Sequence, residues 1–191
     1  MGERALALNR CIIIGGGNTV WDDIAEARKL GTYQAVIAVN DIGAEYPGHI
    51  DIWASLHPEK LPKWTADRHA KGFAPAGMYA AHNGNTNDGR LGRFQPDYKT
   101  DYRWPEMGSS GSSGLFAVKV ALEQGYNRVV LCGVPMRAEA AHFFEARQWS
   151  EVKAFTEAWK LARHRYADNT RSMSGWTAEI LGKPSKEWLA G

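Results

Sequence analysis

Cys11-Ile-Ile-Ile-Gly-Gly-Gly-Asn18 is a short apolar run that ends in three consecutive glycines. A run without polar interruption predicts a strand that is buried on both faces of a sheet. Glycines directly after such a strand predict a tight turn, and Asn18 or Thr19 can cap the helix that follows. Apolar residues then recur at helical spacing until Gly31 ends the pattern, namely Trp21, Ile24, Ala27 and Leu30.

The same alternation of apolar runs and amphipathic segments continues along the chain. Further strands are predicted at Ala35–Val39, Ile50–Leu56, Arg128–Gly133 and Thr170–Met173. Helices are predicted at Leu115–Gln124, from Trp149 to Tyr166, and in the tryptophan-rich tail. The fold class is therefore α/β, an open and mostly parallel sheet flanked by helices. Residues 76–114 are predicted to be an irregular insertion in a single domain that spans 1–191.

The composition excludes several classes of function. The 191 residues carry a formal net charge of +2, so no field that attracts nucleic acid or an anionic membrane is expected. No apolar run reaches membrane-spanning length. Cys11 and Cys132 lie in apolar runs without metal-ligand spacing, which favours free thiols in a reducing compartment. We expect a cytoplasmic protein with a small-molecule partner, and the tail could also serve a contact in a homo-oligomer.

Small or polar residues follow four of the predicted strands, at Gly15–Thr19, Asn40–Asp41, His57–Pro58 and Val134–Arg137. Because the carboxyl ends of parallel strands meet at one edge of a sheet, these residues are predicted to form a ligand site. The first loop allows a nucleotide to approach the backbone closely. It is not a dinucleotide fingerprint, because Val20 stands where the last glycine belongs. A tight turn without a ligand is the alternative.

Acidic residues indicate which part of a nucleotide each loop could hold. Asp22 and Asp23 lie in the first turn of the first helix, where they would repel a bare phosphate. The first loop is therefore predicted to contact a ribose or base, or a magnesium ion between acid and phosphate. Gly111-Ser-Ser-Gly114 precedes a helix without acidic neighbours, so it is predicted to hold the phosphate. An ordinary serine cap is the alternative there.

The remaining candidates come from the later strands and from two histidines. Arg137 and Arg171 could pair with the phosphate, and Ser174 is a further candidate for contact with the nucleotide. His57 ends a predicted strand and His142 lies before the long helix, so either could act as a general base. A polar surface or capping role is the alternative for each. No metal site is predicted, because no Cys, His and Asp set has zinc spacing.

Three stretches resemble one known group of proteins. They are Ile12-Ile-Ile-Gly-Gly-Gly-Asn-Thr19, Val36-Ile-Ala-Val-Asn40, and the segment from Gly111-Ser-Ser-Gly114 through Arg128-Val-Val-Leu-Cys-Gly133. The group is the Rossmann-like domain shared by family 42 sialyltransferases, motility accessory factors and hydroxymethylpterin diphosphokinases. In the sialyltransferase branch the matching residues hold a cytidine nucleotide. The resemblance therefore implies that Gly16, Gly17, Asn18, Asn40, Ser112, Ser113 and Gly114 bind a nucleotide.

The chain departs from that group at two places. His57-Pro58 stands where the sialyltransferase branch has an Asn-Pro pair, and Pro135 replaces an acidic residue after the later strand. These differences leave several functions open. The first is a metal-independent glycosyltransferase-like enzyme that uses a nucleotide-activated sugar. The second is a magnesium-dependent diphosphokinase, for which Asp22, Asp23 or Asp41 would hold the ion. The third is a non-catalytic protein that senses or sequesters a nucleotide, and the last is a structural protein on a degenerate scaffold.

Overall fold

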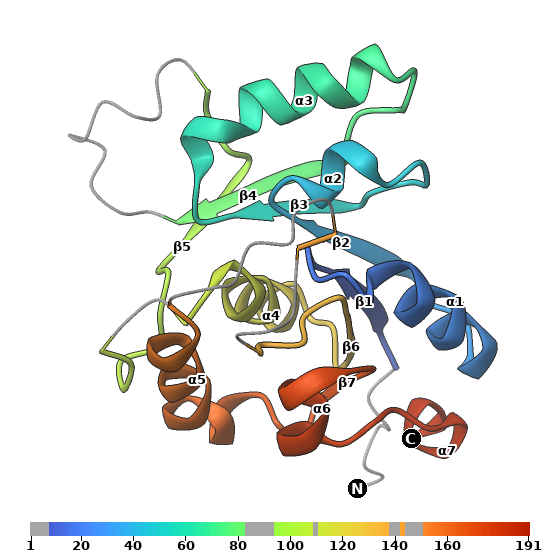
Figure 1. Cartoon of the computed structure of the whole chain (residues 1–191), viewed down its shortest axis with the longest axis vertical. Helices are drawn as coiled ribbons and strands as arrows, with labels where there is room; N and C mark the ends of the chain where they lie inside the picture. Colours follow the sequence, from blue (N-terminus) through green and yellow to red (C-terminus); the bar gives the residue numbers. More distant parts are fainter. Residues whose placement is uncertain (1–7, 83–93, 109–110, 138–141, 144–150) are drawn as a thin grey trace, which may run out of the picture.

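One parallel sheet organises the chain (Figure 1). The computed structural model describes residues 8–82, 94–108, 111–137, 142–143 and 151–191. Within these residues seven strands pair in the order β5-β4-β3-β2-β1-β6-β7, and each pairing is parallel. The strands are β1 (Arg10–Ile14), β2 (Ala35–Val39), β3 (Ile52–Ser55), β4 (Met78–His82), β5 (Tyr98–Thr100), β6 (Arg128–Cys132) and β7 (Thr170–Ser172). This confirms the predicted α/β class with a Rossmann-like open sheet.

Helices cover both faces of the sheet. They are α1 (Val20–Leu30), α2 (Ile42–Glu45), α3 (Leu61–Ala70), α4 (Ser113–Glu123), α5 (Val152–Leu161), α6 (Gly175–Leu181) and α7 (Lys186–Ala190), with 3-10 helices at Pro58–Lys60 and Arg163–Arg165. Side chains of α4, α5 and α6 pack in one apolar cluster, and those of α1, α2, α3 and α7 pack in the other. The sheet is therefore the middle layer of three.

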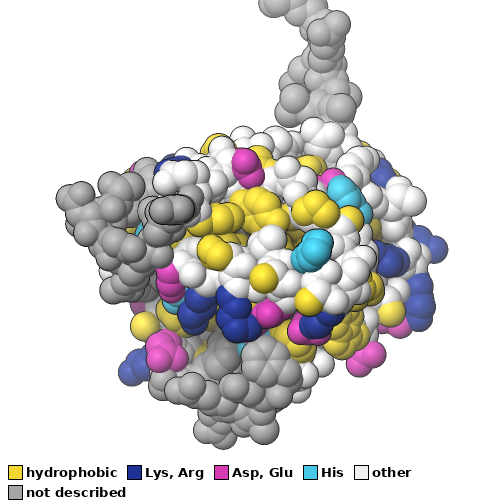
Figure 2. Space-filling model, turned by 90° about the horizontal axis from the view of Figure 1, so that it is seen from above, with side chains coloured by type: hydrophobic (Ala, Val, Ile, Leu, Met, Phe, Trp, Pro, Cys, Tyr) yellow, Lys and Arg dark blue, Asp and Glu magenta, His cyan; other side chains and the backbone are white. Residues whose placement is uncertain are grey.

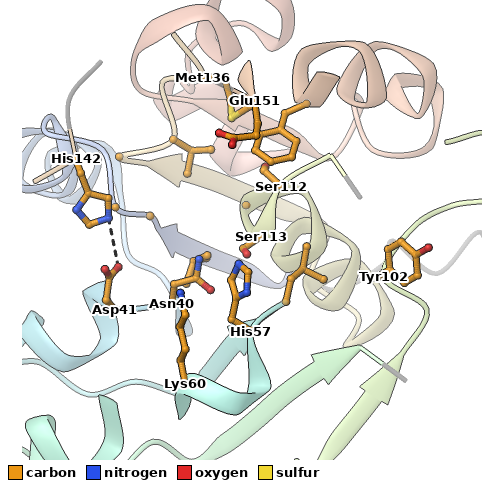
Figure 3. Close-up of a pocket in the computed structure, with 18 of the residues that line it drawn as sticks. Asn40, Asp41, His57, Lys60, Tyr102, Ser112, Ser113, Met136, His142 and Glu151 are labelled. Atoms are coloured by element: carbon orange, nitrogen blue, oxygen red, sulfur yellow. Dashed lines mark ion pairs between the residues drawn. The ribbon is translucent and has the colours of Figure 1, made fainter. Parts of the chain in front are cut away.

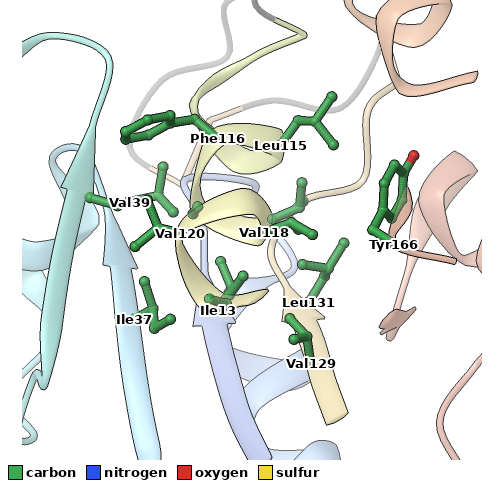
Figure 4. Close-up of a cluster of buried hydrophobic side chains, with 14 of the residues drawn as sticks. Ile13, Ile37, Val39, Leu115, Phe116, Val118, Val120, Val129, Leu131 and Tyr166 are labelled. Atoms are coloured by element: carbon green, nitrogen blue, oxygen red, sulfur yellow. The ribbon is translucent and has the colours of Figure 1, made fainter. Parts of the chain in front are cut away.

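Alternation along each central strand divides the core between the two faces. In β1, Cys11 and Ile13 face the cluster beneath α4, whereas Ile12 and Ile14 face the cluster beneath α1. Figure 4 shows Ile13 beside Val118 of α4 and near Leu131 of β6. Because both faces are buried, the central strands are apolar at every buried position, and only Arg10 and Arg128, at the half-buried starts of β1 and β6, are charged. This explains why the uninterrupted apolar runs correctly predicted β1, β2 and β6.

The order of the strands creates a switch point. From β1 the chain builds outward through β2, β3, β4 and β5, and it then returns to place β6 on the other side of β1. Loops leaving β1 and β6 therefore diverge at the carboxyl edge, which is where ligands bind in open α/β sheets. All the predicted strand-end loops belong to this edge.

Part of the segment predicted as an irregular insertion is regular. Residues 76–114 contain β4 and β5, which extend the sheet beyond β3. The short strand β5 is tied to α4, because Lys119 Nζ donates to Thr100 Oγ1 at 2.9 Å and forms an ion pair with Glu123. Neither strand has the β-branched alternation that marks strands in a sequence. These residues form strands because they pair with the neighbouring strands of the sheet.

Two helices also differ from their predictions. The buried face of α1 includes Val20, Ile24 and Ala27, whereas Trp21 is exposed. Ile24 and Ala27 are buried as predicted, and the first turn buries Val20 and Asp23 in place of Trp21, with the Asp23 carboxylate accepting from Gly133 N. The long helix ends at Leu161 and continues as the 3-10 helix Arg163–Arg165; Trp149, its predicted start, lies outside the described residues.

Both cysteines are buried free thiols on opposite faces of the sheet. Burial raises the pKa of the Cys11 and Cys132 thiols. Because the thiolate is the reactive form, we expect neither thiol of the native protein to react with Ellman's reagent at pH 8. Both should react after unfolding in guanidinium chloride. Rapid labelling of one thiol per native chain would contradict this expectation.

The visible surface carries charges of both signs. On the face shown in Figure 2, Lys and Arg side chains lie next to Asp and Glu side chains and do not form a field of one sign. This mixed pattern agrees with the net charge of +2. Among the described residues, none of the helices is long and apolar enough to span a bilayer.

Candidate functional site

A cavity of about 680 Å³ lies at the carboxyl edge of the sheet. Its wall combines loops after β1, β2, β3 and β6 with the end of β4 and the start of α4 (Figure 3). The lining residues are Gly15, Gly16, Val39, Asn40, Asp41, Leu56, His57, Lys60, Trp64, His82, Tyr102, Ser112, Ser113, Gly114, Gly133, Val134, Met136, His142, Glu151 and Phe155. Apolar walls with a few polar groups are typical of small-molecule sites.

The structure brings most of the predicted site residues together in this cavity. They are Gly15, Gly16, Asn40, Asp41, His57, Ser112, Ser113, Gly114 and His142. The others are not among the lining residues: Gly17, Asn18, Thr19, Arg137 and Ser174. Roles in nucleotide binding stay predictions for the first group. Most residues of the second group make contacts within the protein, and these contacts explain why they do not line the cavity.

The glycines of the first loop are explained by packing against the loop after β6. The amides of Gly15 and Gly17 donate to the carbonyl oxygens of Cys132 and Gly133, each at 2.8 Å. A Cβ on Gly15 would lie 2.7 Å from Gly133 O, and one on Gly17 would lie 2.5 Å from Pro135 Cδ. These two amides are therefore not available to a ligand, and the predicted contact of this loop with a ribose or base stays a prediction.

Asp23 connects the same two loops from inside the protein. Its Oδ2 accepts hydrogen bonds from Gly133 N at 2.8 Å, from Ser174 Oγ at 2.6 Å and from Thr19 Oγ1 at 2.9 Å. Thr19 and Ser174 therefore point to a buried carboxylate, which satisfies their hydroxyl groups. The same bonds occupy one oxygen of Asp23, which is one of the three acids that the diphosphokinase alternative would use for magnesium. No cluster of three or more metal-ligating side chains occurs among the described residues.

The two predicted arginines also lie elsewhere. Arg137 is exposed and forms an ion pair with Glu179 of α6. Arg171 is in β7, where its Nη1 donates to Ala167 O at 2.7 Å and to Thr170 O at 2.8 Å. Neither side chain lines the cavity at the carboxyl edge.

Asn40 is held in place at the centre of the site. Its φ of 57° is in the left-handed region, which asparagine tolerates better than most residues. Its carbonyl oxygen accepts from Trp53 Nε1 at 2.6 Å, and its Oδ1 accepts from Ser55 Oγ at 2.8 Å. Since Oδ1 is occupied, the Nδ2 group is the remaining polar part of the side chain that could donate to a ligand.

His57 is fixed by the same network. Its backbone amide donates to Ser55 Oγ at 2.8 Å, and its Nδ1 lies 3.4 Å from Glu59 Oε1. A carboxylate beside Nδ1 orients the ring and leaves Nε2 for a substrate, as in acid–histidine pairs of known enzymes. Figure 3 shows the ring of His57 pointing toward Ser113 across the cavity.

His142 closes the end of the cavity next to the glycine loop. Its Nε2 lies 3.4 Å from Asp41 Oδ1, and its Nδ1 is buried. The neighbouring amide of Phe143 donates to Gly16 O at 2.8 Å. The imidazole occupies the space that a side chain at position 16 would fill, because a Cβ there would lie 2.4 Å from Nε2. His142 is therefore better placed to shape the cavity than to accept a proton.

This packing makes Gly16→Ala a specific test. The added methyl should force the imidazole away from Asp41, which would shift the His142 ring signals in NMR spectra. Overpacking of this kind is expected to cost about 1–3 kcal/mol of the free energy of unfolding. Gly108→Ala is the matched control, because a Cβ at Gly108 would meet no atom within 4 Å. Unchanged ring signals in Gly16→Ala would contradict the described position of His142.

Backbone strain is concentrated at the cavity. Three described non-glycine residues have a positive φ, namely Asn40 (57°), Ser112 (88°) and Met136 (48°), and all three line the cavity. Ser112 has ψ 157°, a combination that is almost restricted to glycine and costs about 1–3 kcal/mol. Its Oγ is held by Trp159 Nε1 at 3.2 Å and by Leu115 N at 3.4 Å. Such strain is typical of sites where the backbone is positioned for a ligand.

Lys60 is the most informative residue that the sequence analysis missed. It ends the 3-10 helix that follows β3, and Figure 3 shows its side chain reaching toward Asn40 and His57. Among the described residues it has no ion-pair partner, so its ammonium can pair with an anionic ligand. Pro58 could have indicated this position in the sequence, because proline favours the first turn of a helix. A helix that starts directly after the third strand places Lys60 at the carboxyl edge of the sheet. Tyr102, Trp64 and Glu151 were also missed.

An open parallel sheet with a switch point and a cavity at its carboxyl edge defines the class of fold. No family model and no curated protein matches the sequence. A solved structure with a similar fold is that of a mammalian sialyltransferase in complex with Gal-beta-1-3GalNAc-ortho-nitrophenol. The TM-score is 0.52 at 13% sequence identity, over 88% of this chain and 70% of that chain. The chain therefore shares the fold of that structure, and the resemblance to the family 42 and diphosphokinase group stays a prediction.

Proposed function

We propose that the protein binds a nucleotide-activated sugar in the cavity at the carboxyl edge and transfers the sugar to a hydroxyl group. The observation that carries the proposal is the convergence of Asn40, His57, Lys60 and Ser113 on one cavity from separate parts of the chain. The fold that the chain shares with the sialyltransferase structure supports it. Asn40 and the Ser112–Gly114 turn would hold the nucleotide, as the sequence predicted.

The chemistry of the site fits a transfer without metal. His57 Nε2 would take the proton from the acceptor hydroxyl as its oxygen bonds to the sugar carbon. The bond between that carbon and the phosphate oxygen would break, and the nucleotide would leave with the bonding pair. Lys60 would stabilise the charge on the departing phosphate. A diphosphokinase is less well supported, because Asp23 is occupied by internal hydrogen bonds and Asp41 lies against His142.

Calorimetric titration with a panel of nucleotides and nucleotide-sugars tests the proposal, together with mass spectrometry of the products. We expect one nucleotide-sugar to bind and to be consumed in the presence of glycoside acceptors, with and without EDTA. Tight binding without turnover would support a sensing or sequestering protein and overturn the transferase. Magnesium-dependent transfer of diphosphate would support the diphosphokinase. If no nucleotide binds, both the enzyme and the nucleotide sensor are wrong.

Lys60→Gln tests the position of the phosphate. If the ammonium pairs with the phosphate, the variant should bind a nucleoside monophosphate about tenfold more weakly, because one charge-assisted bond is lost. Its affinity for the nucleoside without phosphate should not change. Lys63→Gln is the matched control, since Lys63 is exposed and paired with Asp67 on the outside of α3. Equal losses for nucleoside and nucleotide would contradict this role.

A further inference from the structure

A second cavity, of about 600 Å³, lies at the other end of α5. It is formed by the end of α5, the 3-10 helix Arg163–Arg165, β7 and the end of α6, which lie together in Figure 1. Its lining includes three cations, Lys160, Arg163 and Arg171, but a single carboxylate, Asp168. None of these residues lines the first cavity.

Backbone carbonyl groups hold both guanidinium groups in place without neutralising them. Arg163 donates from Nε and Nη2 to Ile180 O, at 3.2 Å and 3.0 Å. Arg171 donates from Nη1 to two carbonyl oxygens, and its guanidinium lies 4.9 Å from the centre of the Trp188 ring. Within the described residues, none of the three cations is in an ion pair with a carboxylate. Donors remain on each guanidinium for a ligand.

Gathering like charges in this way is unfavourable for the protein alone. Burial lowers the pKa of Arg171, and the charges of Arg128 and Arg163 lower it further, against the opposing effect of Asp168. Arg128 shares the Trp188 ring with Arg171, at 5.2 Å from its centre. His164 also lines the cavity, and its Nε2 lies 3.6 Å from Glu106 Oε1. A bound anion would remove this repulsion.

We infer that the second cavity binds the phosphate group of a small molecule through Arg163, Arg171 and Lys160. Three cations and one carboxylate leave a net charge of two positive units, which balances the negative charge of about two on a phosphate monoester. The planar guanidinium is the group best suited to paired hydrogen bonds with phosphate oxygens. The inference does not depend on the function proposed for the first cavity.

Titration of the full chain with inorganic pyrophosphate, at low and at physiological salt, tests the inference. Lys160→Gln removes one charge without removing a hydrogen bond seen in the structure, and should weaken pyrophosphate binding about threefold. Arg163→Gln with Arg171→Gln should weaken it about a hundredfold, because two charge-assisted contacts are lost. Glutamine can still donate to the carbonyl oxygens, and circular dichroism without pyrophosphate checks the fold.

Two controls decide where pyrophosphate binds. Arg165→Gln removes the same charge two residues from Arg163, outside the cavity, where Arg165 is paired with Glu106. It should leave the affinity unchanged. Lys60→Gln reports on the first cavity, and pyrophosphate bound at the second cavity should persist in that variant. An equal loss in Arg165→Gln would mean non-specific attraction and would overturn the inference. A loss confined to Lys60→Gln would assign pyrophosphate to the first cavity and would also overturn it, as would an absence of binding.

Discussion

Replacing His57 by glutamine is expected to lower the turnover of the proposed transfer by about a hundredfold or more, the usual contribution of a general base. Nucleotide affinity should change little, because the ring acts on the acceptor and the nucleotide is held by other groups. Steady-state rates with a nucleotide-sugar and an excess of acceptor measure the first quantity, and calorimetry measures the second. The expected result is therefore a loss of turnover without a loss of binding.

The carboxylate partner of His57 makes the test sharper. Glu59→Gln keeps the size of the side chain but removes the charge 3.4 Å from Nδ1, so it should lower turnover less than the loss of the ring itself. His49→Gln is the matched control, since His49 is an exposed histidine that faces Asp51 at 3.3 Å in the same kind of pair. If His57→Gln keeps full turnover and His142→Gln loses it, the base is His142 and our assignment is wrong.

The strands that could be predicted are those whose burial on both faces requires an apolar run that is visible in the local sequence. β1, β2 and β6 lie between two helical layers, so every residue after Arg10 in β1 and Arg128 in β6, and all of β2, is apolar and the runs are visible. The strands β4 and β5 lie toward the edge of the sheet, where one contains two alanines and the other only three residues. Their structure depends on pairing with distant residues, and no local pattern reports such pairing.

The sequence predicted the location of the site in the fold but not the contacts that its residues make. Strand ends located Asn40, Asp41 and His57, because the carboxyl edge is common to all parallel strands. The glycines after β1 were interpreted as space for a ligand, yet the loop after β6 and the ring of His142 fill much of that space. That packing joins residues more than a hundred positions apart, so the sequence alone does not distinguish it from a phosphate loop.

The largest effect on stability is expected from Arg68, a buried arginine of α3. Its guanidinium donates to the carbonyl oxygens of Gly43 at 2.9 Å, Tyr46 at 2.6 Å, Gly48 at 2.8 Å and Ala74 at 2.5 Å. Arg68→Met would leave these oxygens without their donor in a buried region. We expect the free energy of unfolding to fall by about 3–5 kcal/mol, measured by urea unfolding.

The same change should reach the site, because Arg68 holds the turn after α2, and α2 begins directly after Asp41. Nucleotide binding by Arg68→Met should therefore weaken even at temperatures where the variant is folded. Arg68→Lys is expected to recover little of the stability, since a single ammonium cannot reproduce the fork that contacts four carbonyl groups. Arg103→Met is the matched control: Arg103 is exposed and donates to Met107 O and Gly108 O at 3.4 Å, so its loss should cost less than about 1 kcal/mol. Equal losses in Arg68→Met and Arg103→Met would show that the buried carbonyl groups find other donors, and that the turn does not depend on Arg68.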